Sequence, residues 1–152
     1  MNLHPSLLPK YRGCSSLTWS MIKGDKVAGF SYHYMEEECD TGNIILQEEL
    51  PIYSYDNQLS LYQRAMVRSL DKFNQAFQLL INGYDGTPQS GEASYFARGA
   101  TNNGEINKDW GHKKIKNFIR AMINPPLPYA VYKEKEIKSY EDFIKIINED
   151  SD

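Results

Sequence analysis

The clearest pattern along the chain is a run of large apolar side chains between residues 58 and 81. These side chains recur at steps of three and four, which places them on one side of a helix. The pattern predicts a long amphipathic helix from about Gln58 to Ile81, with Asp56 as its N-cap and Asn82-Gly83 as its end. We expect this apolar stripe to pack against the core; its members are Tyr62, Met66, Leu70, Phe73, Phe77 and Leu80.

Two strands are predicted before this helix. Residues 28–35 alternate between two sets of side chains, and residues 43–52 are rich in β-branched and other apolar residues. A polar connection with a glycine, residues 36–42, joins them. Other elements are expected as a short helix at 16–23, a helix at 112–123, a strand or hairpin at 129–137, and a final helix at 139–147.

Composition sets the broad class. The 152 residues are 41% hydrophobic and 24% charged, which is typical of a folded domain, and the net charge of -3 argues against extensive nucleic-acid binding. The two cysteines, Cys14 and Cys39, are spaced for neither a disulfide framework nor a metal site. No apolar run approaches the roughly 20 residues of a membrane span, and no secretory pattern opens the chain. We therefore expect a cytoplasmic protein without a metal.

Three polar side chains form the candidate chemistry. Asn2 and His4 are two residues apart, so on an extended segment both point to the same face. Asp40 lies in the polar connection between the two strands. An amide, an imidazole and a carboxylate that converge can stabilise an oxyanion and move a proton, as acyl transfer to an amine requires. From the residues alone, a simple turn at Asp40-Thr41-Gly42 remains the alternative.

The surrounding residues carry a resemblance to a known family. Residues 2–13, Asn-Leu-His-Pro-Ser-Leu-Leu-Pro-Lys-Tyr-Arg-Gly, resemble the first signature of the folate-dependent formyltransferases. Residues 40–45, Asp-Thr-Gly-Asn-Ile-Ile, resemble the second, and the 36 positions between His4 and Asp40 match the spacing of that family. Two motifs in the right register make the resemblance specific.

The resemblance implies transfer of a formyl group from 10-formyltetrahydrofolate to a primary amine, with no metal and no covalent enzyme intermediate. His4 would face the formyl oxygen, and Asn2 would donate a second hydrogen bond to it. Asp40 would hold an ordered water, assist proton transfer and raise the pKa of the histidine, as a nearby carboxylate does. The backbone near Glu38, Cys39 and Asp40 would bind the folate. His33 is interpreted as a structural residue of its strand, and His112 as a solvated one.

The resemblance also implies a fold. We expect an α/β protein that holds the C-terminal part of a formyltransferase-type Rossmann-like sheet with a long amphipathic helix, followed by a small α+β tail. The expected parts are residues 1–83 (catalytic-domain half), 84–111 (linker) and 112–152 (helix and strand subdomain). In the family a Rossmann-like half precedes the first motif, whereas this sequence begins almost at that motif, so we expect the Rossmann-like half to be absent. An exposed sheet edge is then expected to pair with another chain or a second copy.

The sequence departs from the family pattern at two places. Cys14-Ser15-Ser16 stands where a proline usually follows the first signature, and Glu36–Glu38 is unusually acidic beside an anionic folate. The segments 93–96, 106–110 and 119–126 resemble the linker of the tRNA and sugar enzymes, and the remaining tail lacks a basic domain. A nucleotide-linked amino sugar is therefore the favoured acceptor, with methionyl-tRNA as the alternative. A truncated, non-catalytic fragment that needs a partner half is the remaining possibility.

Overall fold

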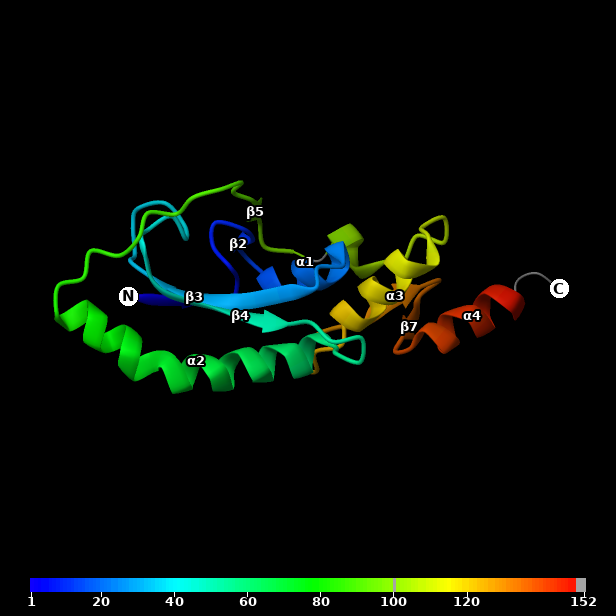
Figure 1. Ribbon diagram of the computed structural model, residues 1–152. Helices are drawn as coiled ribbons and strands as arrows, with labels where there is room; N and C mark the ends of the chain where they lie inside the picture. The colour runs from blue at the N-terminus through cyan, green and yellow to red at the C-terminus, as the bar shows by residue number, and fades with distance from the viewer. Residues whose placement is uncertain (100, 150–152) are drawn as a thin grey trace.

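The computed structural model describes residues 1–99 and 101–149, and its centre is a three-stranded antiparallel sheet in the order β1-β3-β4 (Figure 1). The strands are β1 (Asn2–His4), β3 (Val27–His33) and β4 (Ile44–Pro51). β3 is the middle strand, and all of its residues except Val27 are buried. The predicted strands are confirmed, and the α/β class holds with a sheet whose described pairs are antiparallel.

Helix α2 (Gln58–Ile81) has the predicted bounds and runs along one face of the sheet (Figure 1). Its N-cap is Asn57, which forms a capping box with Ser60, so the prediction of Asp56 as the cap is wrong. Asp56 is instead fully buried, and its carboxylate pairs with Arg64 on the second turn of the helix, which offsets the cost of burying the charge. The carboxylate also accepts a hydrogen bond from the backbone N–H of Tyr53.

The rotation of α2 differs from the prediction. Its buried residues are Leu61, Ala65, Ser69 and Ala76, which lie roughly 100° around the helix from the predicted stripe. Small side chains on this face let the helix approach the sheet, and the hydroxyl of Tyr32 donates a hydrogen bond to the carbonyl of Ser69. Much of the predicted stripe is exposed instead: Tyr62 (42%), Leu70 (73%), Phe73 (43%) and Phe77 (41%).

The opposite side of the sheet carries α1 (Ser16–Lys23) and a short parallel pair of strands (Figure 1). α1 ends at Gly24, whose φ of 79° is the left-handed conformation that glycine adopts freely. In the pair, β2 (Arg12–Gly13) lies beside β5 (Tyr95–Phe96). The segment predicted to be a linker therefore returns to the first signature.

The rest of the chain packs at the end of the sheet near α1. It contains a 3-10 turn, η1 (Thr101–Gly104), helix α3 (His112–Ala121), the hairpin β6 (Ala130–Tyr132) and β7 (Lys135–Ile137), and helix α4 (Tyr140–Glu149). α3 lies against α1, and its buried side chains join the same apolar core as those of the sheet. No helix in the described part of the chain is long and apolar enough to cross a membrane.

Candidate active site

β1 and β3 bring two histidines and an asparagine together. In the antiparallel register Asn2 lies opposite His33, and His4 lies opposite Ser31. His4 and His33 are both buried, at 5% and 2% exposure, whereas Asn2 is exposed. Asn2 and His4 are two positions apart on the extended strand β1, which directs their side chains to the same face as predicted.

The imidazole of His4 is held on both sides. Its Nε2 lies 2.8 Å from the carbonyl oxygen of Tyr11, and a carbonyl can only accept, so Nε2 carries the hydrogen. Its Nδ1 lies 3.4 Å from Oδ2 of Asp40. The structure thus brings together the two residues that belong to separate signatures, and the contact with Asp40 is the longer of the two.

Asp40 is the centre of the polar network. Besides His4, it lies 3.4 Å from Nε2 of His33 through Oδ1, and its Oδ2 accepts a 2.8 Å hydrogen bond from the backbone N–H of Gly13. Its side chain is only 8% exposed. A carboxylate with several polar neighbours and little exposure to solvent is well placed to orient an imidazole and take up a proton.

His33 belongs to this network, so its interpretation as only a structural residue of its strand is incomplete. Its Nδ1 donates to the carbonyl of Tyr34 at 2.7 Å, which leaves Nε2 free to accept from the amide of Asn2 at 3.1 Å. Burial lowers the pKa of His33, and the nearby His4 adds to this, although the Tyr34 carbonyl and Asp40 oppose it. The neutral ring that results orients Asn2.

The loop that carries Asp40 has a constrained backbone. Asp40 has a φ of 57°, in the left-handed region that few residues other than glycine adopt, and asparagine and aspartate tolerate it best. A Cβ on Gly42 would overlap the carbonyl oxygen of Tyr34, so only glycine fits there. These two positions fix the direction of the carboxylate.

A glutamine outside both signatures clamps this loop. The amide nitrogen of Gln89 donates to the carbonyls of Asp40 and Gly42, each at 2.8 Å. Its oxygen accepts from the guanidinium of Arg12 at 2.7 and 3.2 Å. Gln89 therefore joins the two loops of the site, and sequence analysis missed it because it lies in a polar segment without any motif.

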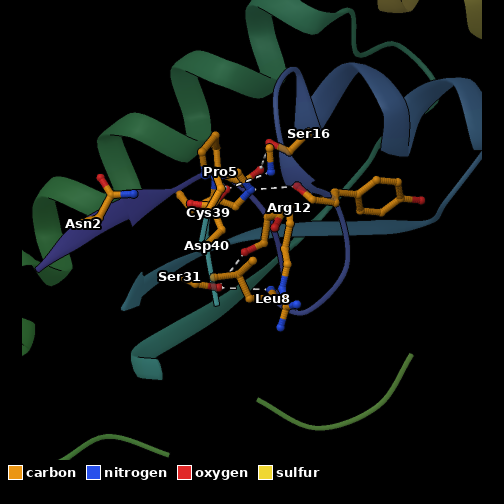
Figure 2. A network of polar contacts seen from close by, with 12 residues as sticks. Asn2, Pro5, Leu8, Arg12, Ser16, Ser31, Cys39 and Asp40 are labelled. Atoms are coloured by element: carbon orange, nitrogen blue, oxygen red, sulfur yellow. Dashed lines mark hydrogen bonds and ion pairs between the residues drawn. The ribbon is translucent and has the colours of Figure 1, made fainter. Parts of the chain in front are cut away.

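The first signature is pinned by buried hydroxyls (Figure 2). Ser16 donates to the carbonyl of Pro5 at 2.8 Å. Ser31 donates to the carbonyl of Ser6 at 2.6 Å and accepts from the backbone N–H of Leu8 at 3.3 Å. The proline-rich segment after His4 is therefore held to α1 and β3 although it has no regular structure.

The other two predicted binding residues, Glu38 and Cys39, are exposed at the edge of the site. The carbonyl of Glu38 accepts a hydrogen bond from the hydroxyl of Thr41, so the loop is closed by its own residues. Burial raises the pKa of the Cys39 thiol, and its contact with Asp40 raises it further, which keeps the thiol protonated near neutral pH.

A small cavity of about 210 Å³ opens beside the imidazole of His4. Its walls come from the first signature, the start of α1, the start of α2 and Asn124. The described residues contain no group of three or more His, Cys, Asp and Glu side chains placed to hold a metal ion. The site is thus a polar pair beside a space large enough for a reacting group.

Comparisons with known proteins agree on one group of relatives. Residues 1–75 match the family model described as formyl transferase. A GDP-perosamine N-formyltransferase of Brucella melitensis is 45% identical over 133 residues, which is 88% of this chain and 51% of that protein. A methionyl-tRNA formyltransferase of Thermodesulfovibrio yellowstonii is 33% identical over 139 residues, 91% of this chain and 45% of that protein.

Comparison with solved structures finds relatives of the same group. A crystal structure of WlaRD, a sugar 3N-formyl transferase in the presence of dTDP and 5-N-formyl-THF, superposes with a TM-score of 0.81 at 29% identity. That match covers 91% of this chain and 52% of WlaRD. The chain thus spans about half the length of the proteins that it matches.

Proposed function

Because this chain belongs to the formyl transferase family through residues 1–75, we propose that it transfers a formyl group from 10-formyltetrahydrofolate to a primary amine. The observation that carries the proposal is the meeting of His4 and Asp40, at 3.4 Å, beside a cavity that the histidine lines. An imidazole that lines a small cavity and contacts a carboxylate provides, with that carboxylate, the acid and base groups that acyl transfer to an amine needs.

In the proposed reaction the acceptor amine attacks the formyl carbon of the donor. The C–N bond to N10 of the folate then breaks, the amine loses a proton, and tetrahydrofolate leaves with a proton on N10. Negative charge develops on the formyl oxygen while the new bond forms, and hydrogen-bond donors aimed at that oxygen lower the barrier. His4 and Asn2 are those donors in our proposal, and Asp40 takes up the proton of the amine.

The hydrogen bonds of the two donors fit these roles. Nε2 of His4 already donates to the carbonyl of Tyr11, so His4 would donate to the formyl oxygen through Nδ1, with the ring protonated on both nitrogens. The contact of Nδ1 with Asp40 is the longer of the two, so this is the side at which a substrate oxygen or a water can enter. The amide of Asn2 uses one N–H on His33 and keeps the second for the formyl oxygen. The backbone of the loop around Glu38, Cys39 and Asp40 is the proposed folate-binding segment.

We propose a nucleotide-linked amino sugar as the acceptor. The 45% identity to a GDP-perosamine N-formyltransferase supports this choice over methionyl-tRNA, since methionyl-tRNA formyltransferases of four organisms are 32% to 35% identical. A solved N-formyltransferase from Helicobacter canadensis, in complex with folinic acid and dTDP-3-aminofucose, superposes with a TM-score of 0.80 at 28% identity. We place the reaction in the cytoplasm, where free thiols such as Cys14 and Cys39 stay reduced.

We also propose that the protein works in contact with further polypeptide, either a second copy or a partner half. β1 lies at an edge of the sheet, and α2 presents exposed apolar side chains such as Leu70 and Phe77. An open strand edge and a contiguous apolar face favour association.

The test is a formyl-transfer assay on the full product of the gene that encodes this chain, with 10-formyltetrahydrofolate and a nucleotide-linked amino sugar. We expect His4→Ala and Asp40→Ala each to lower kcat/KM by about 10²-fold or more, because each removes a group that acts on the reacting atoms. Asn2→Ala is expected to lower it about tenfold, as one of two donors is lost.

The matched control is His112→Ala, which removes the described histidine that lies outside the network, on α3. Near-native turnover by His4→Ala or Asp40→Ala would contradict the assigned roles. If the unmodified protein binds no folate in calorimetry and forms no product, the non-catalytic alternative replaces the proposal.

A further inference from the structure

A second cavity, of about 320 Å³, adjoins the one beside His4. Both cavities are lined by Ser15 and Gln58, so they meet between the start of α1 and the start of α2. The outer walls of the second cavity come from η1 and from the segment after α3, including Leu127. A ligand that reaches His4 with one end therefore has room for its other end here.

The lining of this second cavity is uncharged among the described residues. One wall is the indole of Trp19, which also contacts the ring of Phe96 with 4.3 Å between ring centres and 30° between planes. Phe96 is not among the residues that line the cavity, so its contact with the indole lies outside the cavity. Thr18, Gln58 and Asn103 supply hydrogen-bonding groups.

We propose that this cavity binds the nucleobase of the acceptor, an inference that rests on the proposed function. A base is planar, neutral and rich in hydrogen-bonding edges, which suits an aromatic wall with amides and a hydroxyl around it. The charged diphosphate does not suit an uncharged cavity and would lie outside it. The amino sugar would then occupy the smaller cavity, with its amine toward His4.

The binding test uses Trp19 as the reporter. The chain has two tryptophans, so Trp110→Phe leaves the fluorescence of Trp19 alone. GDP, UDP and dTDP are titrated separately, and ribose 5-phosphate serves as the ligand without a base. We expect at least one nucleotide to quench the fluorescence with saturation and ribose 5-phosphate to have no effect, because a base stacks on the indole.

A matched pair of variants tests the location. Gln58→Ala, made in the Trp110→Phe protein, removes an amide that lines both cavities, and should weaken nucleotide binding about fivefold, as for one lost hydrogen bond. Gln63→Ala removes the same side chain from an exposed position of the same helix and should leave binding unchanged. Leu127→Ala opens the outer wall and should also weaken binding.

The outcomes separate this inference from the proposed function. If formyl transfer to a nucleotide-linked sugar depends on His4 but Gln58→Ala and Leu127→Ala leave the acceptor KM unchanged, the cavity assignment is overturned and the function stands. If nucleotides saturate Trp19 but no formyl transfer occurs, the base-binding site stands and the function fails. Quenching by L-methioninamide but by no nucleotide would overturn the assignment in favour of a methionyl acceptor.

Discussion

At the scale of single residues, His33 links the stability of the protein to pH. Its pKa is lowered in the folded protein, mainly by burial, so the unfolded chain takes up the proton first as the pH falls through about 6.5. The free energy of unfolding should therefore decrease below about pH 6.5 and flatten once the folded histidine is also protonated. Urea denaturation at pH 5, 6 and 7.5 measures the effect.

The control for this prediction is His33→Gln, which keeps a polar side chain able to bond Asn2 but does not titrate. We expect its unfolding free energy to depend less on pH over the same range. An equal dependence in both proteins would mean that other groups cause the loss. The variant should retain part of its formyl-transfer rate if His33 acts by positioning Asn2, with which it forms a hydrogen bond, and not by contact with the substrate.

Gln89 allows a second prediction at this scale. Gln89→Leu removes the amide that bonds the carbonyls of Asp40 and Gly42, while it keeps a side chain of similar size. The loop should become looser, with about a tenfold lower kcat and about 1–2 kcal/mol less stability. Steady-state kinetics and thermal unfolding measure these changes.

The matched control for Gln89 is Gln78→Leu, the same substitution at an exposed position of α2. It should leave both kcat and the unfolding temperature close to those of the unmodified protein. If the two variants behave alike, the contacts of Gln89 with the Asp40 loop contribute nothing to its function.

The candidate site was only partly predictable from the sequence. Asn2, His4 and Asp40 stand out because they lie in two motifs with a typical spacing. His33 and Gln89 do not, because their contacts join positions 31 and 49 residues apart and no local pattern indicates them. Only the register of β1 on β3, and the return of the chain to β2, bring these side chains to the site.

At the scale of elements, the ends of α2 were predictable and its rotation was not. The change from polar residues to a three-and-four pattern and back marks the ends at Gln58 and Ile81. Two neighbouring sides of the helix carry apolar residues, however, and the side with smaller ones faces the sheet. The hydrogen bond from Tyr32 to Ser69 and the close approach that Ala65 permits decide between them.

The buried ion pair at the start of α2 belongs to a set of hydrogen bonds that joins α2 and α3 to the loop before α2. Asp56 accepts two hydrogen bonds from the guanidinium of Arg64, and Arg120 of α3 donates to the carbonyls of Tyr53 and Asp56. Burial by itself would raise the pKa of Asp56, but hydrogen bonds from Arg64, the Tyr53 N–H and Ser60 outweigh it and lower the pKa. This carboxylate therefore stays ionised well into the acid range.

From this pair we predict that Asp56→Ala lowers the free energy of unfolding by about 3 kcal/mol, because it leaves a partly buried guanidinium without its partner. Asp71→Ala is the control, since Asp71 forms an exposed pair with Arg68 and should cost less than about 0.5 kcal/mol. Urea denaturation of the two variants provides the comparison. Equal effects would mean that the buried pair adds nothing beyond an exposed one.

At the scale of the whole molecule, we predict that the exposed apolar side of α2 mediates association of this chain. Leu70 and Phe77 are exposed, and Phe77 stacks on Phe73 with 5.9 Å between ring centres. We predict that this chain, purified by itself, self-associates, and that Leu70→Lys with Phe77→Lys shifts it toward the monomer. Sedimentation velocity over a range of concentrations measures the shift.

Tyr55→Lys is the control for association, because Tyr55 is 77% exposed but lies before α2. The double variant should lose little thermal stability, since Leu70 and Phe77 are both exposed and only the stack of Phe77 on Phe73 is removed. A chain that stays monomeric at all concentrations would contradict the prediction.

The division of the chain at residues 83 and 111 remains a prediction, although α3 and the sheet share one apolar core.

The amide of Gln89 has a consequence for anyone who shortens this protein. A version that stops at Gly83 would retain Asn2, His4 and Asp40, which are proposed to do the chemistry. It would lose strand β5, which pairs with β2, and the hydrogen bonds from Gln89 that hold the Asp40 loop. Grafting the two signatures onto another scaffold, or exchanging tails between relatives, should therefore carry the residues through Phe96 as an inseparable part of the transplant.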